Sequence, residues 1–500
     1  MASGKPRPQE AVSLQQLVTI LGHGDQDALE RYIASNFDPE GLRTTSAKER
    51  ADRLARLYVD SGGFLITKPV AGKSGADVAF ARAKYTDLPS CLTLKTKVVG
   101  ARTLITDFTA VDLPLPASRD LRTPGPREVV STMTPFIDRL TRVDTFSGVV
   151  LIAKDGRPIM RKAYGKASLA YDAPNHLGTR FNIASIGKSI TAVSIGQLHD
   201  EGRLSLDDKV GKFLPDYPDK AVRGTVTIRH LLTHTSGLGP KSEFTNSPLW
   251  NARRSRIRTV AAHLPLIIGQ PLESEPGARY SYSNAGFVIL GLIIEKATGQ
   301  SYYDVVAQKV FARAGMTRSF YHEADSQEPD VATPLTNFVP GIFPVSSSGE
   351  PTVDDYGFRL GPKRAATLEG AAKGGAHGGA FVTADDLLKF ITSVRTAKLT
   401  FPATARLLTT RQEDVRLAGA KTGLGFETWT QNGHSIIGHN GGDIGVSAIA
   451  YHFNESGYTT VVLSNYDPRA IRAIARKLRG LLTRSTIGEP SPAPATDCTV

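Results

Sequence analysis

The chain has 500 residues, more than one ordinary hydrophobic core accommodates, so we expect two domains, one of which can carry a subdomain. Its apolar share of 40% and its many glycines and prolines indicate a globular protein. The net charge of +12 comes from basic residues that are spread along the chain without interleaved aromatic residues, which argues against a nucleic-acid partner. No apolar run approaches the length of about 20 residues that a transmembrane helix needs, so no membrane span is expected.

The two cysteines, Cys91 and Cys498, are too few and too far apart in the sequence to predict a disulfide framework or a metal site. Residues 1–10 include two basic side chains but no apolar segment follows them, so we expect no secretory leader. A mature periplasmic or secreted protein and a cytoplasmic protein would both have such a start. The last residues, 485–500, contain three prolines and few apolar side chains, which predicts a disordered tail. The sequence leaves the compartment and the oligomeric state open.

Residues 10–116 predict a small α+β accessory domain. Apolar residues recur at helical spacing over residues 14–21, and residues 64–67 and 92–99 alternate as half-buried strands do. No nucleophile and base stand at a suitable spacing in this region, so its role cannot be predicted. The proline-rich segment 117–128 is the predicted linker to the next domain.

Residues 129–484 form the predicted second domain. Residues 146–153 and 159–164 predict a hairpin, because Asp155 and Gly156 between them supply the positive φ angles of a tight turn. A long, mainly helical stretch follows. The remaining predicted elements are three strands and a final helix, at residues 435–439, 446–452, 459–464 and 469–482. We therefore expect an α/β (α+β) fold, in which helices flank an antiparallel sheet and a mainly helical subdomain lies beside it, with the active site in the cleft between them.

The segment Ser185-Ile-Gly-Lys188 opens a predicted helix that ends at Gly202. Residues three apart lie on one face of a helix, with Cβ atoms about 5–6 Å apart, so the lysine nitrogen can reach the serine oxygen. A serine hydroxyl needs a base to become nucleophilic, and a desolvated lysine can be that base or tune another one. The helix N-terminus adds positive potential where an oxyanion would form. Taken alone, the pair is better explained by an N-cap serine and an exposed lysine.

Two further motifs support the catalytic interpretation. Tyr282-Ser-Asn284 lies at a predicted loop-to-helix junction, and His439-Asn-Gly441 lies at the end of a predicted strand. The order Ser-x-x-Lys, Tyr-x-Asn and Lys/His-x-Gly resembles the class C β-lactamase and DD-peptidase superfamily, including its esterases and D-aminopeptidases. The resemblance covers residues 147–465 and leaves the N-terminal domain outside it.

The resemblance implies that Ser185 is the acylated nucleophile, Lys188 its activating partner and Tyr282 a proton relay. Tyrosine ionises near pH 10, so charging it at neutral pH costs about 4 kcal/mol unless nearby cations offset that cost. Lys188 can supply such a cation, or it can be neutral and act as the base itself. The sequence leaves both assignments open.

The other residues that the resemblance implies orient the substrate. Asn284 would hold the lysine and the substrate amide or carbonyl, and His439 would help to position the tyrosine and the leaving group. The oxyanion hole would consist of the backbone N–H groups of the nucleophile and of Gly442, next to Gly441.

In the β-lactamases that this chain resembles, the third motif is usually Lys-Thr-Gly. In this chain the third motif is His439-Asn-Gly441. The fixed lysine charge that would grip a β-lactam carboxylate is missing. We therefore expect a serine hydrolase that cleaves small esters or amides through an acyl-Ser185 intermediate. The preferred hypothesis is a carboxylesterase. The alternatives are a D-aminopeptidase, a DD-peptidase or a weak β-lactamase. A catalytically silent binding protein on the same fold would have lost the nucleophile, the lysine or the tyrosine, and all three are present.

Several other patterns predict structural roles. His230 and His234 have the helical spacing of zinc ligands, but no glutamate follows the first and no third ligand stands out, so we expect structural histidines and neither metal nor cofactor. The glycine-rich run 374–379 predicts tight backbone beside the pocket, with His377 either in its wall or in a plain loop. The basic residues within 253–258 predict a solvated helix face.

Overall fold

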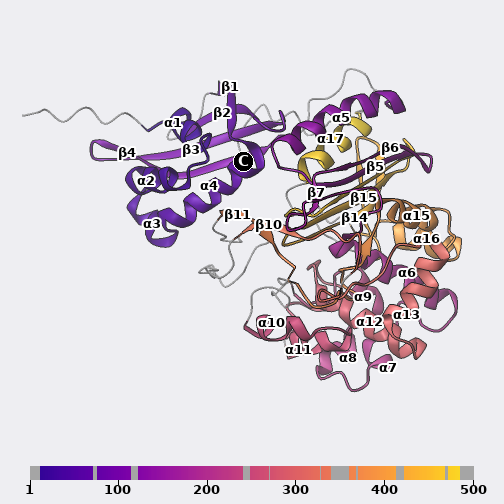
Figure 1. The fold of residues 1–500 in the computed structure, drawn as a ribbon. Helices are drawn as coiled ribbons and strands as arrows, with labels where there is room; N and C mark the ends of the chain where they lie inside the picture. The colour runs from indigo at the N-terminus through magenta and orange to yellow at the C-terminus, as the bar shows by residue number, and fades with distance from the viewer. Residues whose placement is uncertain are drawn as a thin grey trace, which may run out of the picture.

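Figure 1 shows the computed structural model of the chain. The described residues are 12–70, 76–113, 122–239, 248–269, 271–326, 328–338, 360–367, 370–412, 422–467 and 471–484. The predicted tail, 485–500, and residues 117–121 of the predicted linker lie outside them. Helix α5 (Pro126–Arg142) begins inside the other part of that linker. Proline is well suited to this first helical position, because its missing N–H would have no partner there.

The N-terminal domain packs four helices against a four-stranded antiparallel sheet of order β1-β2-β3-β4 (Figure 1). Its elements are α1 (Leu14–Leu21), α2 (Gln26–Asn36), α3 (Pro39–Thr44), α4 (Ala47–Ser61), β1 (Phe64–Val70), β2 (Ala76–Ala83), β3 (Pro89–Val99) and β4 (Arg102–Asp112). The predicted helix and both predicted strands are present. Fully buried leucines of α1, α2 and β3 form the core, namely Leu17, Leu29 and Leu92. The domain therefore has a hydrophobic core of its own.

Cys91 of β3 is disulfide-bonded, a bond that the sequence analysis did not predict. Cys498, the other cysteine of the chain, lies outside the described residues. The expectation rested on separation in the sequence, and that separation does not limit distance in the folded chain.

The second domain is built on a six-stranded antiparallel sheet of order β13-β14-β15-β16-β5-β6. Its strands are β5 (Gly148–Lys154), β6 (Arg157–Tyr164), β13 (Glu427–Gln431), β14 (His434–Asp443), β15 (Val446–Phe453) and β16 (Tyr458–Ser464). The predicted hairpin is β5-β6, and Asp155 and Gly156 have φ angles of +50° and +78° in its turn. The sheet therefore joins the first hairpin of the domain to its last four strands, of which the sequence predicted β14, β15 and β16 but not β13.

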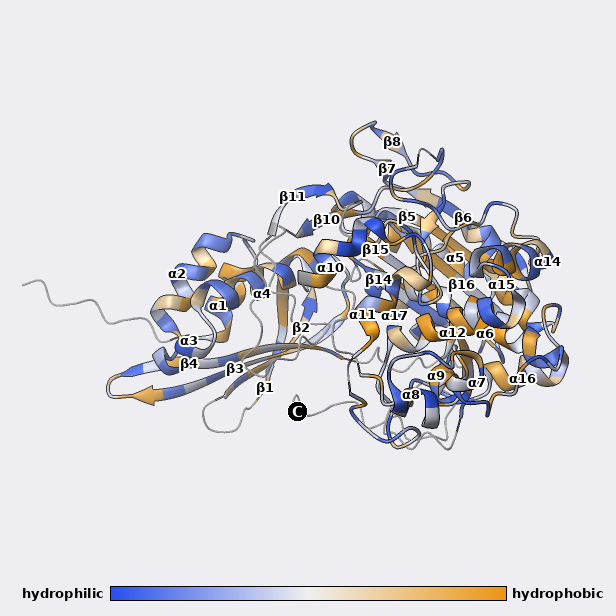
Figure 2. Cartoon of the chain, turned by 90° about the horizontal axis from the view of Figure 1, so that it is seen from below, coloured by the Kyte–Doolittle hydropathy of each residue, from blue (hydrophilic) through white to orange (hydrophobic). Residues whose placement is uncertain are grey.

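Helices cover both faces of this sheet (Figure 1). On one face, α5 and α17 (Arg472–Leu482) bury an apolar stripe that includes Ile137 and Leu478. On the other face lie α15 (Ala384–Arg395) and α6 (Gly187–Asp200). Helix α6 is buried on all sides from its first residue to Leu198, and it packs against α12, which is mostly apolar (Figure 2). A helix that is buried all round can hold reactive groups in fixed positions away from water.

The mainly helical subdomain lies beside the sheet, at the bottom of Figure 1. Its helices are α7 (Val210–Phe213), α8 (Lys220–Thr225), α9 (Ile228–Leu232), α10 (Pro248–Arg253), α11 (Leu264–Ile267), α12 (Asn284–Thr298), α13 (Tyr302–Val305), α14 (Ala312–Ala314) and α16 (Pro402–Thr409), with the short turns η1 (Ala184–Ile186), η2 (Arg254–Arg256), η3 (Ala261–His263) and η4 (Val306–Phe311). Three two-stranded sheets pair β7 (Lys166–Ser168) with β8 (Ala173–Pro174), β9 (Phe181–Asn182) with β12 (Phe381–Val382), and β10 (Leu335–Phe338) with β11 (Leu360–Ala365).

The N-terminal domain contacts the helices that cover the sheet. The guanidinium of Arg476 on α17 donates to the carbonyl oxygen of Pro89 at 2.8 Å and pairs with Asp112 at 3.0 Å. Arg139 of α5 donates to the carbonyl oxygen of Thr86 at 3.3 Å. Because these arginines belong to helices of the second domain, they tie the two domains together.

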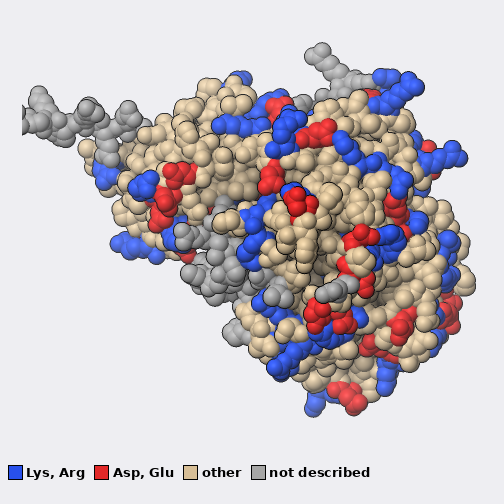
Figure 3. Space-filling model, in the orientation of Figure 1, with Lys and Arg blue, Asp and Glu red and all other residues tan. Residues whose placement is uncertain are grey.

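The charged side chains are mixed in sign on the face shown in Figure 3. Within the predicted basic helix face, Arg253 and Arg256 are exposed, as expected. Arg258 instead pairs with Glu323 at 2.6 Å and with Asp325 at 2.5 Å. The expectation was wrong for Arg258 because the chain leaves helical geometry after η2. None of the helices in the described part of the chain is long and apolar enough to span a bilayer.

Candidate active site

Ser185 lies in the turn η1, which leads directly into α6, and its half-buried side chain lines a cleft of about 1900 Å³. Ala184 before it has a φ of +42°, a region that side-chain-bearing residues rarely adopt, so the surrounding structure holds this turn under strain. Gly441 of β14 packs against the turn: a Cβ atom there would lie 2.2 Å from the carbonyl oxygen of Ile183 and 2.9 Å from the amide nitrogen of Ser185. Glycine in the third motif therefore lets the strand approach the nucleophile.

Lys188 is fully buried in the first turn of α6. Its Nζ donates to Ser185 Oγ at 3.1 Å, to Asn284 Oδ1 at 2.8 Å and to the carbonyl oxygen of His377 at 2.6 Å. A charged amine has three N–H donors for these acceptors. A neutral amine has two N–H groups for the amide and the carbonyl, and its lone pair then faces the serine. In either state Asn284 Oδ1 and the carbonyl oxygen of His377 hold Nζ within hydrogen-bonding distance of Ser185 Oγ.

Tyr282 approaches the nucleophile too, and its hydroxyl donates to Ser185 Oγ at 2.7 Å. Burial raises the pKa of Tyr282 well above its usual range. The hydrogen bond with Ser185 lowers that pKa, while Tyr280 and Glu427 raise it further. Tyr282 therefore keeps its proton at neutral pH and is a proton donor in the resting site.

His234 supports the ring of Tyr282, a role that the sequence analysis missed. The two rings stack with centroids 4.4 Å apart and an interplanar angle of 25°. His234 Nδ1 accepts the backbone N–H of Ser283 at 3.0 Å. Burial, with smaller effects from Lys188 and His439, lowers the pKa of His234 well below its usual value, so the ring is neutral. The available signal was the segment Thr-His-Thr-Ser-Gly-Leu around it, which belongs to the family resemblance.

His230, the other histidine of that predicted pair, has separate surroundings. It lies on α9, where its Nδ1 accepts the backbone N–H of Thr227 at 3.3 Å and its own N–H donates to Thr227 Oγ1 at 3.2 Å. This is a capping box at the start of the helix. The described residues contain no group of three or more histidine, cysteine, aspartate or glutamate side chains that could hold a metal ion.

His439 lies within β14 rather than at its end, because the strand continues to Asp443. Burial lowers the pKa of His439, an effect that Glu427 opposes and Lys188 reinforces, so the ring is neutral at pH 7. Its Nδ1 contacts the carbonyl oxygen of Asn440. Among the described residues no hydrogen bond joins the His439 ring to Tyr282. The third motif therefore presents a neutral ring to the cleft.

A carboxylate that no motif predicted lies beside the third motif. Glu427, the first residue of β13, pairs with Gly438 of β14 and lines the cleft. Its Oε1 accepts the side-chain N–H of Asn440 at 2.5 Å, and its Oε2 accepts the hydroxyl of Tyr451 at 2.6 Å. No local pattern in the sequence predicts this placement, because it depends on the register between two strands.

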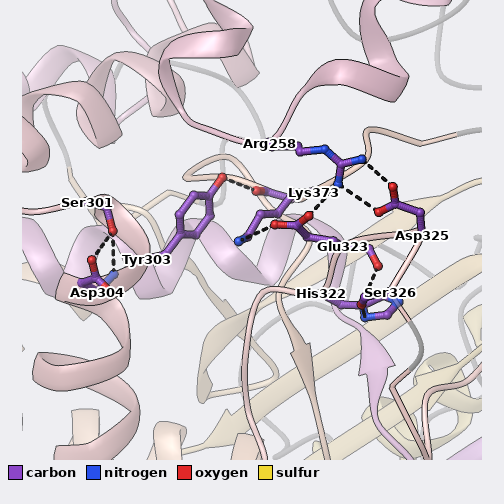
Figure 4. Close-up of polar contacts among 10 residues, drawn as sticks. Arg258, Ser301, Tyr303, Asp304, His322, Glu323, Asp325, Ser326 and Lys373 are labelled. Carbon is purple, nitrogen blue, oxygen red and sulfur yellow. Dashed lines mark hydrogen bonds and ion pairs between the residues drawn. The ribbon is translucent and has the colours of Figure 1, made fainter.

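Polar contacts anchor the start of the glycine-rich run, as Figure 4 shows. Lys373 pairs with Glu323 at 3.2 Å, and the hydroxyl of Tyr303 donates to the carbonyl oxygen of Gly374 at 2.8 Å. The run continues to His377, which lines the cleft. The carbonyl oxygen of His377 accepts a hydrogen bond from Lys188 Nζ. Contacts remote from Ser185 thus fix the backbone carbonyl that holds the amine of Lys188.

The cleft extends from Ser185 to the N-terminal domain, which contributes Arg56, Asp112 and Leu113 to its wall. Asn284, Gly441 and Gly442 line it near the nucleophile, so the structure gathers all the residues that the motifs nominated, with Lys188 buried beneath. The participation of the N-terminal domain was not predictable, because that domain lies outside the family resemblance.

Comparison with known proteins identifies this arrangement. The family profile described as "Beta-lactamase" matches residues 136–484. The chain belongs to the β-lactamase family. Penicillin-binding protein 4* of Bacillus subtilis (strain 168) is 35% identical to this family member over 176 residues, which are 35% of this chain and 38% of that protein. The matched stretch therefore spans well under two thirds of that curated relative.

Solved structures of the β-lactamase family share the fold. The penicillin-binding protein from Bacillus halodurans superposes with a TM-score of 0.57 at 27% identity, covering 71% of this chain and 98% of that one. EstCE1, a hydrolase with promiscuous acyltransferase activity, superposes with a TM-score of 0.55 at 23% identity, covering 72% and 98%. The chain thus shares the mixed α/β fold of these proteins and belongs to the β-lactamase family.

Proposed function

We propose that this β-lactamase-family protein is a carboxylesterase that cleaves small esters through an acyl-Ser185 intermediate. The observation that carries the proposal is the position of Ser185 Oγ, which lies 3.1 Å from the amine of Lys188 and 2.7 Å from the hydroxyl of Tyr282. A nucleophile between a base and a proton donor, at the wall of an open cleft, has the parts that acyl transfer requires.

In acylation, Ser185 Oγ attacks the ester carbonyl carbon and its proton passes to neutral Lys188. The N–H groups of Ser185 and Gly442 would hold the oxyanion that forms. Tyr282 gives its proton to the alkoxide oxygen as the carbon–oxygen bond breaks, and the alcohol leaves. The lysine is the better assignment for the base, because burial disfavours the tyrosinate that would otherwise be needed at the start.

In deacylation, water attacks the acyl carbon and its proton returns to the tyrosinate of Tyr282. Ser185 Oγ leaves the acyl carbon and recovers a proton from the charged Lys188. The lysine amine lies 4.8 Å from the centre of the Tyr282 ring, so its positive charge can stabilise the tyrosinate between the two steps. All three groups return to their starting protonation states.

The electrostatics of the third motif favour esters over β-lactams. His439 occupies the position at which the β-lactamases that this chain resembles usually have a lysine, and burial keeps the His439 ring neutral. A neutral ring offers no fixed charge to a β-lactam carboxylate. Esters are also more reactive than amides and demand less from the pocket.

A substrate panel tests the proposal. Purified protein and the variant S185A are incubated with p-nitrophenyl esters of increasing chain length, D-amino-acid amides and a chromogenic cephalosporin. We expect turnover of the short-chain esters by the native protein and none above background by S185A. Inert short-chain esters, together with cleavage of the amides or of the cephalosporin, would overturn the esterase assignment.

A further inference from the structure

Glu427 places a negative charge on the wall of the cleft, beside the catalytic groups. Its carboxylate is held in place by two neutral donors, the amide of Asn440 at 2.5 Å and the hydroxyl of Tyr451 at 2.6 Å. The side chain is only partly buried, so a ligand in the cleft can reach it.

Three other carboxylates that line this cleft differ from Glu427, because each faces an arginine. Glu328 pairs with Arg180 at 3.9 Å, Asp330 pairs with Arg318 at 2.9 Å, and Asp112 pairs with an arginine of α17. Glu427 forms no ion pair with a lysine or arginine among the described residues. Its two hydrogen bonds fix its position without cancelling its charge, so the charge remains available to a ligand.

Glu427 lies on the third-motif side of the site, because its carboxylate holds Asn440, the neighbour of His439, and all three line the same cleft as Tyr282. It raises the pKa values of Tyr280 and Tyr282 and opposes the effect of burial on His439. In the proposed mechanism Tyr282 gives its proton to the leaving group. A group attached to the departing alcohol would therefore lie near this carboxylate.

We propose that Glu427 is a specificity-determining residue that selects substrates whose leaving group carries a positive charge and rejects those whose leaving group carries a carboxylate. The inference rests on the proposed function, because it assigns a substrate class to the same site. Opposite charges attract more strongly beside a low-dielectric wall than in bulk water, and like charges are excluded by the same field. Selectivity then comes from attraction of one class together with repulsion of the other.

Three acetate esters with one acyl group test the inference. They are the choline ester, its neutral carbon isostere 3,3-dimethylbutyl acetate, and 3-acetoxypropionate. We expect kcat/KM of the native protein to be about tenfold higher for the choline ester than for the neutral ester, and about tenfold lower for the anionic ester, which corresponds to steps of about 1.4 kcal/mol. These ratios should shrink as the salt concentration rises.

The variant E427Q removes the charge and retains a side chain that can accept from Asn440. In E427Q the three esters should differ by less than about twofold. E328Q is the matched control, because it removes one charge from the same cleft at a carboxylate that already faces an arginine; it should keep the native ratios. Unchanged ratios in E427Q, or their equal loss in E328Q, would overturn the inference.

A binding readout separates this inference from the esterase proposal. Choline, 3,3-dimethylbutanol and 3-hydroxypropionate compete with a fluorophosphonate that labels Ser185. Protection by choline in the native protein and not in E427Q supports the inference even if no ester is cleaved. Equal protection by the three alcohols in the native protein contradicts it even if esters are cleaved.

Discussion

The two sides of Ser185 are built differently. On one side Lys188 is fully buried, and the protein itself supplies its acceptors, Asn284 and a backbone carbonyl. On the other side Glu427 and His439 line an open cleft. The buried side fixes the amine of Lys188 away from solvent, whereas the open side presents charge and shape to a ligand. We infer that the buried side sets the rate of chemistry for every substrate and that the open side sets which substrate reacts.

The largest expected effect comes from Lys188 on the buried side. The substitution K188M keeps the length of the side chain and removes the base, so kcat/KM should fall at least about 10³-fold for cationic, neutral and anionic esters alike. Ester hydrolysis followed for the three charge classes measures this. K212M changes an exposed lysine paired with Asp208 at 2.7 Å and should leave activity unchanged. A loss confined to one charge class would break the division between the two sides.

Tyr282 lies between the two sides, and its loss should have the next largest effect. Y282F keeps the ring against His234 and removes only the proton donor, so kcat should fall about 10²-fold with little change in thermal stability. Y280F is the matched control, because Tyr280 is a half-buried neighbour for which no hydrogen bond to Ser185 is found among the described residues. Near-native turnover by Y282F would remove the hydroxyl from the mechanism.

His234 is a positioning residue behind the tyrosine, and its effect should be smaller. H234A removes the stacked ring, and we expect kcat to fall about tenfold because Tyr282 loses its fixed orientation. H230A removes the other histidine of the segment, which caps α9, and costs about 1 kcal/mol of stability without a comparable loss of kcat. Measurement of kcat and of the melting temperature in both variants distinguishes the positioning role from a purely structural one. Equal losses of kcat in H234A and H230A would show that His234 has only a structural role.

Asp467 should affect stability and have the smallest effect on turnover. It accepts the backbone N–H of Gly445 at 2.9 Å and the hydroxyl of Thr336 at 3.0 Å, and burial raises its pKa to about 6. The folded protein therefore holds this proton more tightly than the unfolded chain, whose carboxyl has a pKa of about 3.9. The resulting stabilisation is complete below pH 4 and is lost as the pH rises through 6, by at most about 3 kcal/mol.

The variant D467N isolates that contribution. Urea unfolding at pH values from 4 to 7 should show that the stability of the native protein relative to D467N declines as the pH rises, while kcat of the two stays similar. A difference in stability that is constant over this range would show that Asp467 does not titrate there.

The sequence predicted the buried side of the site better than the open side. Ser185 and Lys188 lie within one helical turn, so their proximity follows from local geometry, and the Tyr-x-Asn motif places Asn284 at the start of α12. The antiparallel sheet was predictable because the turn of its first hairpin and the alternation of its strands are local signals as well. These features need no knowledge of distant contacts.

The features that escaped prediction depend on distant contacts. Glu427 faces the third motif only because of the register of β13 on β14, and His234 meets the tyrosine only through packing. The cleft wall to which Arg56 contributes likewise joins segments that are far apart in the chain. The fold of the N-terminal domain was predicted from periodicity, and its place in the cleft required the structure.

Covalent labelling of the nucleophile tests the central claim most directly. Native protein and K188M are treated with a fluorophosphonate, and the modified residue is located by intact-mass measurement and peptide mapping. The account predicts one label per chain, on Ser185, formed at least about 10³-fold more slowly in K188M. A label on any other residue, or equal labelling rates in the two proteins, would contradict it.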